Sequence, residues 1–253
     1  MTFVIYNYLC VMSLSTKIRN IIVRLSDGKS FGYADLNLSR EEYTNAAKVL
    51  ERLQKDGLIK RFSKGVFYKP EKTIFGELIP VNNELLKPYM NENGKRVAYE
   101  TGTVLYNRMG LTTQMAFRTK IASRNKRVSI NREAIKADAV KSYVDVTENN
   151  YQLLGVLDAI KDIRQIPDSN IAQSVKIITG IINSLPDKEK SKLIKYALLY
   201  PPRARALVGA ILENLATAKK DLKALNESLN PLTQIKLGLD EQDLPTVKNW
   251  NIV

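Results

Sequence analysis

Histidine is absent from the 253 residues, and cysteine occurs once, as Cys10. The lack of histidine removes the commonest general base, the commonest zinc ligand and every Ser–His or Cys–His nucleophile pair. A single cysteine excludes an internal disulfide framework and is typical of a reducing cytosol. The sequence also lacks a Gly-rich phosphate loop, a G-x-S-x-G elbow and any zinc-ligand spacing. We therefore expect no enzyme, no cofactor and no metal site.

A membrane-spanning run is missing as well. The apolar stretch of residues 3–14 is too short to cross a bilayer and contains Asn7. It has neither the basic start nor the cleavage site of a signal peptide. We expect residues 1–13 to form an N-terminal extension of a cytoplasmic protein with no membrane partner. Met12 stands just before a helix-start signal. An alternative interpretation is therefore that residues 1–11 come from an upstream start codon and do not belong to the native protein.

Acidic residues are too few to balance the basic ones. The chain has 39 Lys and Arg against 26 Asp and Glu, and the net charge of +13 indicates a polyanionic partner. The excess is densest at the N-terminus, where 13 basic residues face 7 acidic ones through Lys72. A solvated basic surface is the alternative interpretation.

Residues 14–72 carry the pattern of a winged helix-turn-helix domain. A helix begins at Leu14, and its apolar residues fall on one face. A short element covers residues 31–36, and Ser39, with Glu42 three residues later, is typical of a helix N-cap. That last helix is expected to end at Gly57. Two β-rich runs, residues 58–62 and 66–68, are joined by a Gly-containing turn and predict a hairpin, the wing.

The helix that begins after Ser39 is amphipathic. Its apolar residues gather on one side, and its polar and basic residues gather on the other. The N-terminal half of a recognition helix normally penetrates the major groove, and a wing contacts the backbone. The residues expected to reach base edges are Arg40, Thr44, Asn45 and Lys48, and those expected to hold the backbone are Lys60, Arg61, Ser63 and Lys64. For each of these residues taken alone, a place on a solvated face without any DNA contact is an equally good interpretation.

The rest of the chain predicts an α+β protein with three further parts. Residues 73–149 form a mixed α/β segment, residues 150–230 a helical region, and residues 231–253 a partly ordered tail in which residues 232–239 could add an edge strand. Helices are expected at residues 82–90, 101–108, 150–164, 170–184, 187–199 and 202–227, and strands at residues 112–117, 127–130 and 134–137.

A second basic cluster lies in the mixed segment, where residues 123–126 resemble a hairpin turn. The cluster is a possible second nucleic-acid or partner surface, or equally a solvated hairpin tip. Its candidate residues are Arg118, Lys120, Arg124, Lys126 and Arg127.

Three stretches of the chain resemble the AbiEi family of antitoxins. They are residues 31–36, the pattern Ala47-x-x-Leu50-x-x-Leu53-x-x-x-Gly57-Leu58-Ile59 together with residues 64–70, and the segment Thr101-Gly102-x-x-Leu105-x-Asn107-x-x-Gly110-Leu111-Thr112-Thr113-Gln114. The last stretch is the most specific, because winged helices are common to many regulators. The sequence departs from the family in having Met115-Ala116 where Val-Pro is expected.

The resemblance implies the antitoxin of a bacterial type IV toxin–antitoxin system, which acts in phage defence. In this family the winged helix is a transcriptional repressor of its own promoter and binds inverted repeats in duplex DNA. The rest of the protein counteracts a nucleotidyltransferase toxin without a stable complex. We expect a monomer or a weak dimer on DNA, with the eight residues named above as its DNA contacts.

Alternatives remain at this point. The protein could be a stand-alone winged-helix transcriptional regulator whose C-terminal region senses a ligand or partner, or a nucleic-acid-processing enzyme that uses unrecognised carboxylates. The polar residues between Gly102 and Gln114 could form an antitoxic surface, or could be caps and turn residues that fix a helix-to-strand corner.

Overall fold

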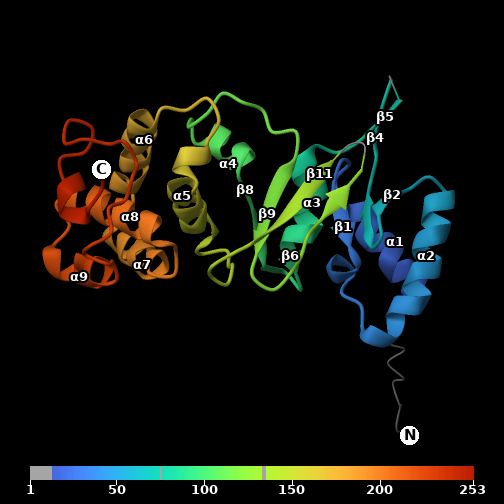
Figure 1. Cartoon of the computed structure of the whole chain (residues 1–253). Helices are drawn as coiled ribbons and strands as arrows, with labels where there is room; N and C mark the ends of the chain where they lie inside the picture. Colours follow the sequence, from blue (N-terminus) through green and yellow to red (C-terminus); the bar gives the residue numbers. More distant parts are fainter. Residues whose placement is uncertain (1–12, 75, 133–134) are drawn as a thin grey trace, which may run out of the picture. The chain divides into compact units, whose positions relative to one another are not determined.

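The computed structural model describes residues 13–74, 76–132 and 135–253, and it has an α+β fold (Figure 1). Residues 1–12 of the expected N-terminal extension therefore lie outside the described residues. The chain divides after Gly94 into two compact units, which we call unit 1 (Met1–Gly94) and unit 2 (Lys95–Val253). This boundary differs from the expected divisions near residues 72, 149 and 230. Side chains of the mixed segment, the helical region and the C-terminal residues share one core, so they form one unit.

Unit 1 begins with helices and short strands in the order that the sequence predicts. Its elements are α1 (Leu14–Arg24), β1 (Ser30–Gly32), η1 (Tyr33–Leu36), η2 (Arg40–Glu42), α2 (Tyr43–Lys55), β2 (Lys60–Ser63), β3 (Val66–Tyr68), β4 (Glu71–Thr73), β5 (Gly76–Leu78), α3 (Asn82–Met90) and β6 (Asn91–Glu92). The first three strands form an antiparallel sheet in the order β1-β3-β2. The helix expected from Ser39 is present, but its first turn is the 3-10 helix η2.

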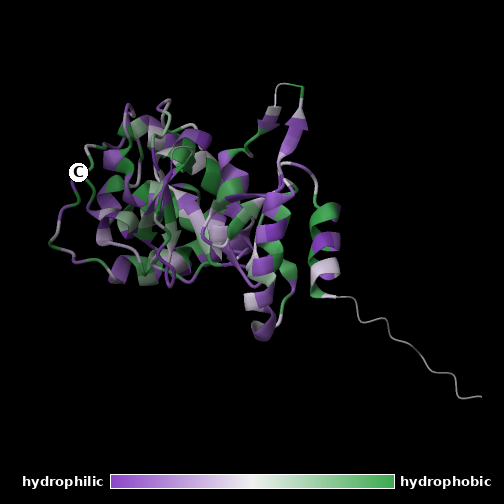
Figure 2. Ribbon diagram, turned by 90° about the vertical axis from the view of Figure 1, so that its right-hand side faces the viewer, coloured by the Kyte–Doolittle hydropathy of each residue, from purple (hydrophilic) through white to green (hydrophobic). Residues whose placement is uncertain are grey.

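The core of unit 1 forms because α1 and α2 are amphipathic. Ile18 and Ile22 of α1 meet Leu50 and Leu53 of α2, and all four side chains are buried. The opposite sides of the helices stay polar, so green and purple alternate around the helices in Figure 2. The wing hairpin closes the same core through Phe67, whose ring stacks 5.8 Å from that of Phe31.

A second hairpin, β4–β5, follows the wing and was not expected from the sequence. Its register pairs Thr73 with Gly76, and Ile74 at its tip is 93% exposed. Lys60 of β2 forms an ion pair with Glu77 of β5. The α3 helix spans the residues that the sequence predicts.

Unit 2 combines one sheet with a set of helices. Its elements are β7 (Lys95–Arg96), β8 (Ala98–Thr101), α4 (Thr103–Arg108), β9 (Thr119–Ser123), β10 (Ile130–Asn131), β11 (Lys136–Lys141), α5 (Tyr151–Lys161), η3 (Ile163–Gln165), α6 (Ile171–Asn183), α7 (Asp187–Ala197), α8 (Pro202–Asn214), α9 (Lys219–Glu227) and η4 (Val247–Trp250). The four-stranded sheet has the order β10-β11-β9-β8, and its β9 and β11 run parallel.

Several expectations for the mixed segment are wrong. The α4 helix begins at Thr103, because Thr101 ends β8 and Gly102 has a φ of 72°. No strand covers residues 112–117, which are described throughout. There the Thr112 hydroxyl and the Asn107 amide bind nearby backbone groups in place of a strand ladder. Of the strand expected at residues 127–130, only Ile130 pairs with a neighbouring strand. The strand expected at residues 134–137 is β11, which begins at Lys136. Ala134 lies outside the described residues.

The loop after Ser123 is not a hairpin turn. Since β10 pairs only with β11 in the sheet order, the chain leaving β9 passes the end of β11 and returns on its far side. The second basic cluster therefore includes a crossing loop rather than a hairpin tip.

The C-terminal residues are also more ordered than expected. Residues 231–253 pack on the core of unit 2, where Leu237, Leu244 and Trp250 are buried. The expected edge strand is reduced to one bridge between Ile235 and Ile252. The expected helix at residues 202–227 is broken into α8 and α9 because Ala216 adopts a left-handed conformation with a φ of 59°. No helix of the described residues is long and apolar enough to cross a membrane.

Candidate nucleic-acid interface

The exposed side of α2 presents the polar residues that the sequence singled out. The Ser39 N–H donates to the Glu42 carboxylate over 2.7 Å and orders the start of this segment. Ala46, Val49, Leu50 and Leu53 turn inward, which leaves Thr44, Asn45 and Lys48 exposed on the opposite side. Arg40 is the first residue of η2, next to this helix. The burial of one side thus orients the other side toward solvent.

The wing lies beside the C-terminal half of α2. Gly65 has a φ of 78°, which lets the chain turn tightly after Lys64. The Arg61 side chain is held along the hairpin, because its Nε donates to the Ser63 carbonyl over 3.2 Å. Lys64 is exposed, and no ion pair holds it among the residues that the structure describes.

A groove of about 700 Å³ separates α2 from the wing. Lys48 borders it from the helix, Arg61 and Lys64 border it from the hairpin, and Tyr33 and Phe67 contribute apolar walls. Tyr33 is fixed there by ring contacts with Tyr43 at 5.5 Å and Phe67 at 6.0 Å. Three of the eight expected DNA contacts are therefore gathered on one hollow.

The acidic residue of this groove is Glu51, and its charge is already paired. Lys55, four residues later on α2, lies 3.0 Å from the Glu51 carboxylate. The cations of the groove therefore remain available to a polyanion. Arg52, exposed on the same helix four residues after Lys48, is not among the contacts expected from the sequence.

Two of the expected backbone contacts have partners elsewhere in unit 1. Lys60 binds Glu77, and this hydrogen bond raises the pKa of Lys60 and lowers the pKa of Glu77. The Ser63 hydroxyl is hydrogen-bonded to the hydroxyl of Tyr89 on α3. These partners come from segments that follow the wing, so local sequence gives no sign of them.

The second basic cluster belongs to unit 2 and is partly neutralised. The Arg118 guanidinium makes two hydrogen bonds of 2.6 Å to the Asp138 carboxylate, and this pairing lowers the pKa of Asp138. Lys120 is exposed on β9. Arg124, Lys126 and Arg127 line a hollow of about 320 Å³ together with Lys141, a residue that sequence reasoning did not select.

The polar residues between Gly102 and Gln114 are engaged in local structure. Asn107 donates to the carbonyls of Thr112 and Gln114, and the Thr112 hydroxyl donates to the carbonyl of Pro167 over 2.7 Å. The Gln114 amide donates to Asp168. These contacts favour the interpretation that the residues fix a corner, whereas the exposed side chain of Thr113 fits either interpretation.

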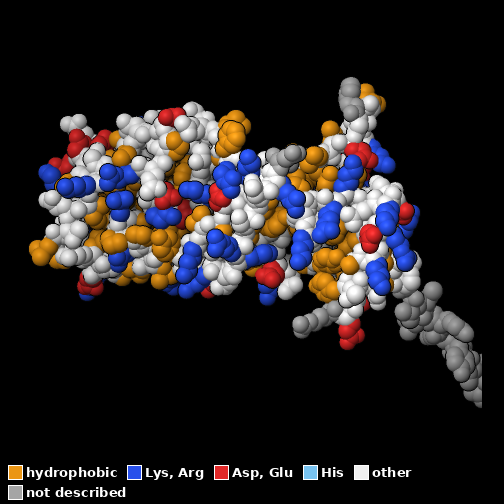
Figure 3. All heavy atoms as spheres, turned by 45° about the vertical axis from the view of Figure 1, so that its right-hand side comes forward, with side chains coloured by type: hydrophobic (Ala, Val, Ile, Leu, Met, Phe, Trp, Pro, Cys, Tyr) orange, Lys and Arg blue, Asp and Glu red, His pale blue; other side chains and the backbone are white. Residues whose placement is uncertain are grey.

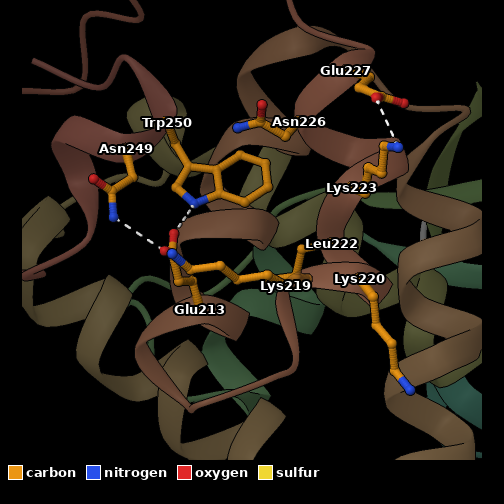
Figure 4. A pocket seen from close by; sticks show the side chains of 9 residues that line it. All are labelled: Glu213, Lys219, Lys220, Leu222, Lys223, Asn226, Glu227, Asn249 and Trp250. Carbon is orange, nitrogen blue, oxygen red and sulfur yellow. Dashed lines mark hydrogen bonds and ion pairs between the residues drawn. The ribbon is translucent and has the colours of Figure 1, made fainter.

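A further hollow in unit 2 has mixed charge. It occupies about 610 Å³ between α8, α9 and the C-terminal segment, and lysines and carboxylates both line it (Figure 4). Glu213 accepts hydrogen bonds from Asn249 and from the Trp250 indole, and Lys223 lies 3.6 Å from Glu227. Glu213 therefore joins α8 to the C-terminal segment, whereas the Lys223–Glu227 pair lies within α9.

Across both units, Lys and Arg side chains are spread over the face shown in Figure 3, with Asp and Glu among them. The described residues contain no group of three or more Cys, Asp or Glu that could hold a metal ion.

The family model DUF6088, a family of unknown function, matches residues 17–194, and the chain belongs to this family. Comparison with curated proteins gives no match. Among solved structures, the crystal structure of the Rv2827c protein from Mycobacterium tuberculosis is similar to this chain with a TM-score of 0.49 and 10% identity. The similarity covers 87% of this chain and 82% of that chain.

Proposed function

We propose that the protein is a non-enzymatic, cytoplasmic DNA-binding protein whose unit 1 is a winged helix-turn-helix domain. The observation that carries the proposal is the groove between α2 and the wing, where Lys48, Arg61 and Lys64 converge. In this proposal α2 enters the major groove of duplex DNA, with Thr44, Asn45 and Lys48 toward base edges. Arg61 and Lys64 neutralise backbone phosphates beside it.

We further propose that the protein is the antitoxin of a type IV toxin–antitoxin system and represses its own promoter. The resemblance of residues 31–70 and 101–114 to AbiEi antitoxins supports this role. Unit 1 then sets the amount of protein made, and unit 2 counteracts a nucleotidyltransferase toxin. The alternative is a stand-alone regulator that senses a ligand, and the observation that favours it is the hollow beside Trp250 (Figure 4).

A gel-shift on the upstream promoter tests the DNA-binding proposal. Replacing Lys48 and Lys64 by Ala should weaken binding about tenfold or more and reduce the slope of log affinity against log salt by roughly one unit per lost phosphate contact. The matched control replaces Lys188 and Lys195, two exposed lysines of α7, and should bind like the unaltered protein. Equal weakening by both pairs would show that net charge alone acts, and would overturn the assignment of the interface.

Co-expression separates the antitoxin from the stand-alone regulator. If a nucleotidyltransferase is encoded next to this gene and arrests growth, co-expression of the full chain should relieve the arrest. The Lys48→Ala and Lys64→Ala variant should still relieve it from an inducible promoter, because these residues lie in unit 1. Persistent arrest in the presence of folded protein would contradict the antitoxin role and leave the DNA-binding role untouched.

A further inference from the structure

The crossing loop between β9 and β10 forms one wall of a hollow at the end of two parallel strands. Lys141 closes β11 directly opposite Ser123, the last residue of β9, so both carboxyl ends meet at the same edge (Figure 1). In open α/β sheets, ligands bind outside the carboxyl ends of parallel strands, and the pair β9 and β11 presents one such edge here. The hollow measures about 320 Å³ and belongs entirely to unit 2.

The side chains around this hollow are basic. Arg124, Lys126 and Arg127 come from the loop and Lys141 comes from β11, and no acidic or aromatic side chain of the described residues lines it. Arg124 is partly balanced, since its Nε lies 3.7 Å from the Asp145 carboxylate. Among the described residues, no ion pair engages the other three cations. An anion that enters the hollow would therefore interact favourably with all three cations.

The loop that carries these cations is held in shape by hydrogen bonds at its start and to neighbouring segments. The Ser123 hydroxyl donates to the Val97 carbonyl over 2.7 Å and accepts from the Lys126 N–H over 3.2 Å. Arg124 donates to the Tyr143 carbonyl over 2.7 Å. A loop fixed in this way loses little conformational freedom when a ligand binds.

We propose that this hollow is a phosphate-binding site, formed by Lys126, Arg127 and Lys141 with Arg124 beside them. Arginine and lysine are the side chains that proteins use for phosphate groups, and arginine can donate two parallel hydrogen bonds to one. The lack of an aromatic lining means that bases are not stacked there, so the phosphates are what is recognised. Such phosphates belong either to a nucleic-acid backbone or to a free polyphosphate. The proposal does not depend on the DNA-binding role of unit 1.

Isothermal titration calorimetry of the full chain with sodium tripolyphosphate measures the affinity of the site. The unaltered protein should bind, and the Lys126→Ala/Lys141→Ala variant should bind at least about tenfold more weakly, because two of the charges on the ligand lose their partners. The Lys188→Ala/Lys195→Ala variant removes the same charge from α7 and should bind like the unaltered protein. Absence of binding, or equal weakening by both variants, would overturn the proposal.

The source of the phosphate is decided in a second arm. Tripolyphosphate binding is measured with and without an excess of a 20-base-pair duplex. The protein is the full-length chain carrying Lys48→Ala and Lys64→Ala, so that the interface of unit 1 does not bind the duplex. Displacement of tripolyphosphate by excess duplex assigns the site to a nucleic-acid backbone, whereas unchanged tripolyphosphate binding in excess duplex assigns it to a free polyphosphate. The Arg127→Ala variant provides an independent check, since it should also bind tripolyphosphate more weakly than the unaltered protein. Unaltered binding by Arg127→Ala would contradict the site as defined.

Discussion

Asp158 on α5 is a carboxylate that the fold surrounds with hydroxyl groups. It is 3% exposed and accepts hydrogen bonds from Tyr99 at 2.8 Å, Thr101 at 2.7 Å and Tyr200 at 3.2 Å. Lys161 lies 3.7 Å away. Tyr99 and Thr101 belong to β8, and Tyr200 stands two residues before α8, so this one side chain connects the sheet of unit 2 to its helices. Its ionisation therefore bears on the stability of the whole unit.

Burial raises the pKa of Asp158 above its ordinary value of 3.8, and Lys161 and the hydroxyl donors only partly oppose this shift. A folded-state pKa above the unfolded one means that Asp158 contributes stability below the unfolded pKa, and that this contribution is lost as the pH rises through the folded pKa. In Asp158→Asn one acceptor oxygen remains, an amide group replaces the other, and the titration is removed. The free energy of unfolding of the variant, minus that of the unaltered protein, should therefore increase as the pH rises from about 4. Urea unfolding at a series of pH values measures this, and a difference that falls or stays constant with pH would contradict the burial effect.

Individual residues also show what sequence reasoning can and cannot reach. Lys48 was assigned to the exposed side of its helix from spacing alone, because an amphipathic pattern fixes both sides of a helix. Lys60 and Ser63 were assigned to the same surface, yet Glu77 and Tyr89 engage them. The sequence does not indicate Lys141, because its nearness to Arg127 depends on the parallel pairing of β9 and β11. Contacts between distant segments have no local signature.

At the scale of elements, the helices were predicted well where an apolar period of 3.6 residues continued over several turns. The α3, α6 and α7 helices lie where that period indicates, within a few residues. The β8 and β9 strands were missed, since their buried residues include polar ones such as Thr101 and Ser123 and so lack a clean alternation. The C-terminal segment was missed because it is ordered by packing on α8 rather than by a period of its own.

The packing of this segment depends on Gly209 in α8. A Cβ at Gly209 would lie 2.2 Å from the Trp250 ring, so Gly209→Ala should displace the ring and lower the free energy of unfolding by about 3 kcal/mol. Trp250 is the only tryptophan of the chain, and its displacement should shift the fluorescence emission to the red. The control is Gly180→Ala, at an exposed position in α6 with nothing within 4 Å, which should raise stability by about 0.5–1 kcal/mol. Unchanged fluorescence in Gly209→Ala would contradict the role given to this contact.

At the scale of the whole molecule, the two units have separate cores. The buried cluster of unit 1 comes from residues 18–67, and that of unit 2 from residues 99–252. Each cluster contains fully buried aliphatic side chains of its own, such as Leu50 in the first and Leu157 in the second. Burial of apolar surface is the dominant favourable contribution to folding, so each unit has its own source of stability.

We therefore expect the full chain to unfold in two transitions. Leu50→Ala should cost about 2–5 kcal/mol and lower the melting temperature of unit 1 alone, by roughly 4–8 °C for each kcal/mol in a unit of this size. Gly209→Ala should lower that of unit 2 alone, by roughly 2–4 °C for each kcal/mol. Differential scanning calorimetry resolves the two transitions, and Trp250 fluorescence identifies the one that belongs to unit 2. A single transition that both substitutions shift equally would show that the two cores unfold as one cooperative body.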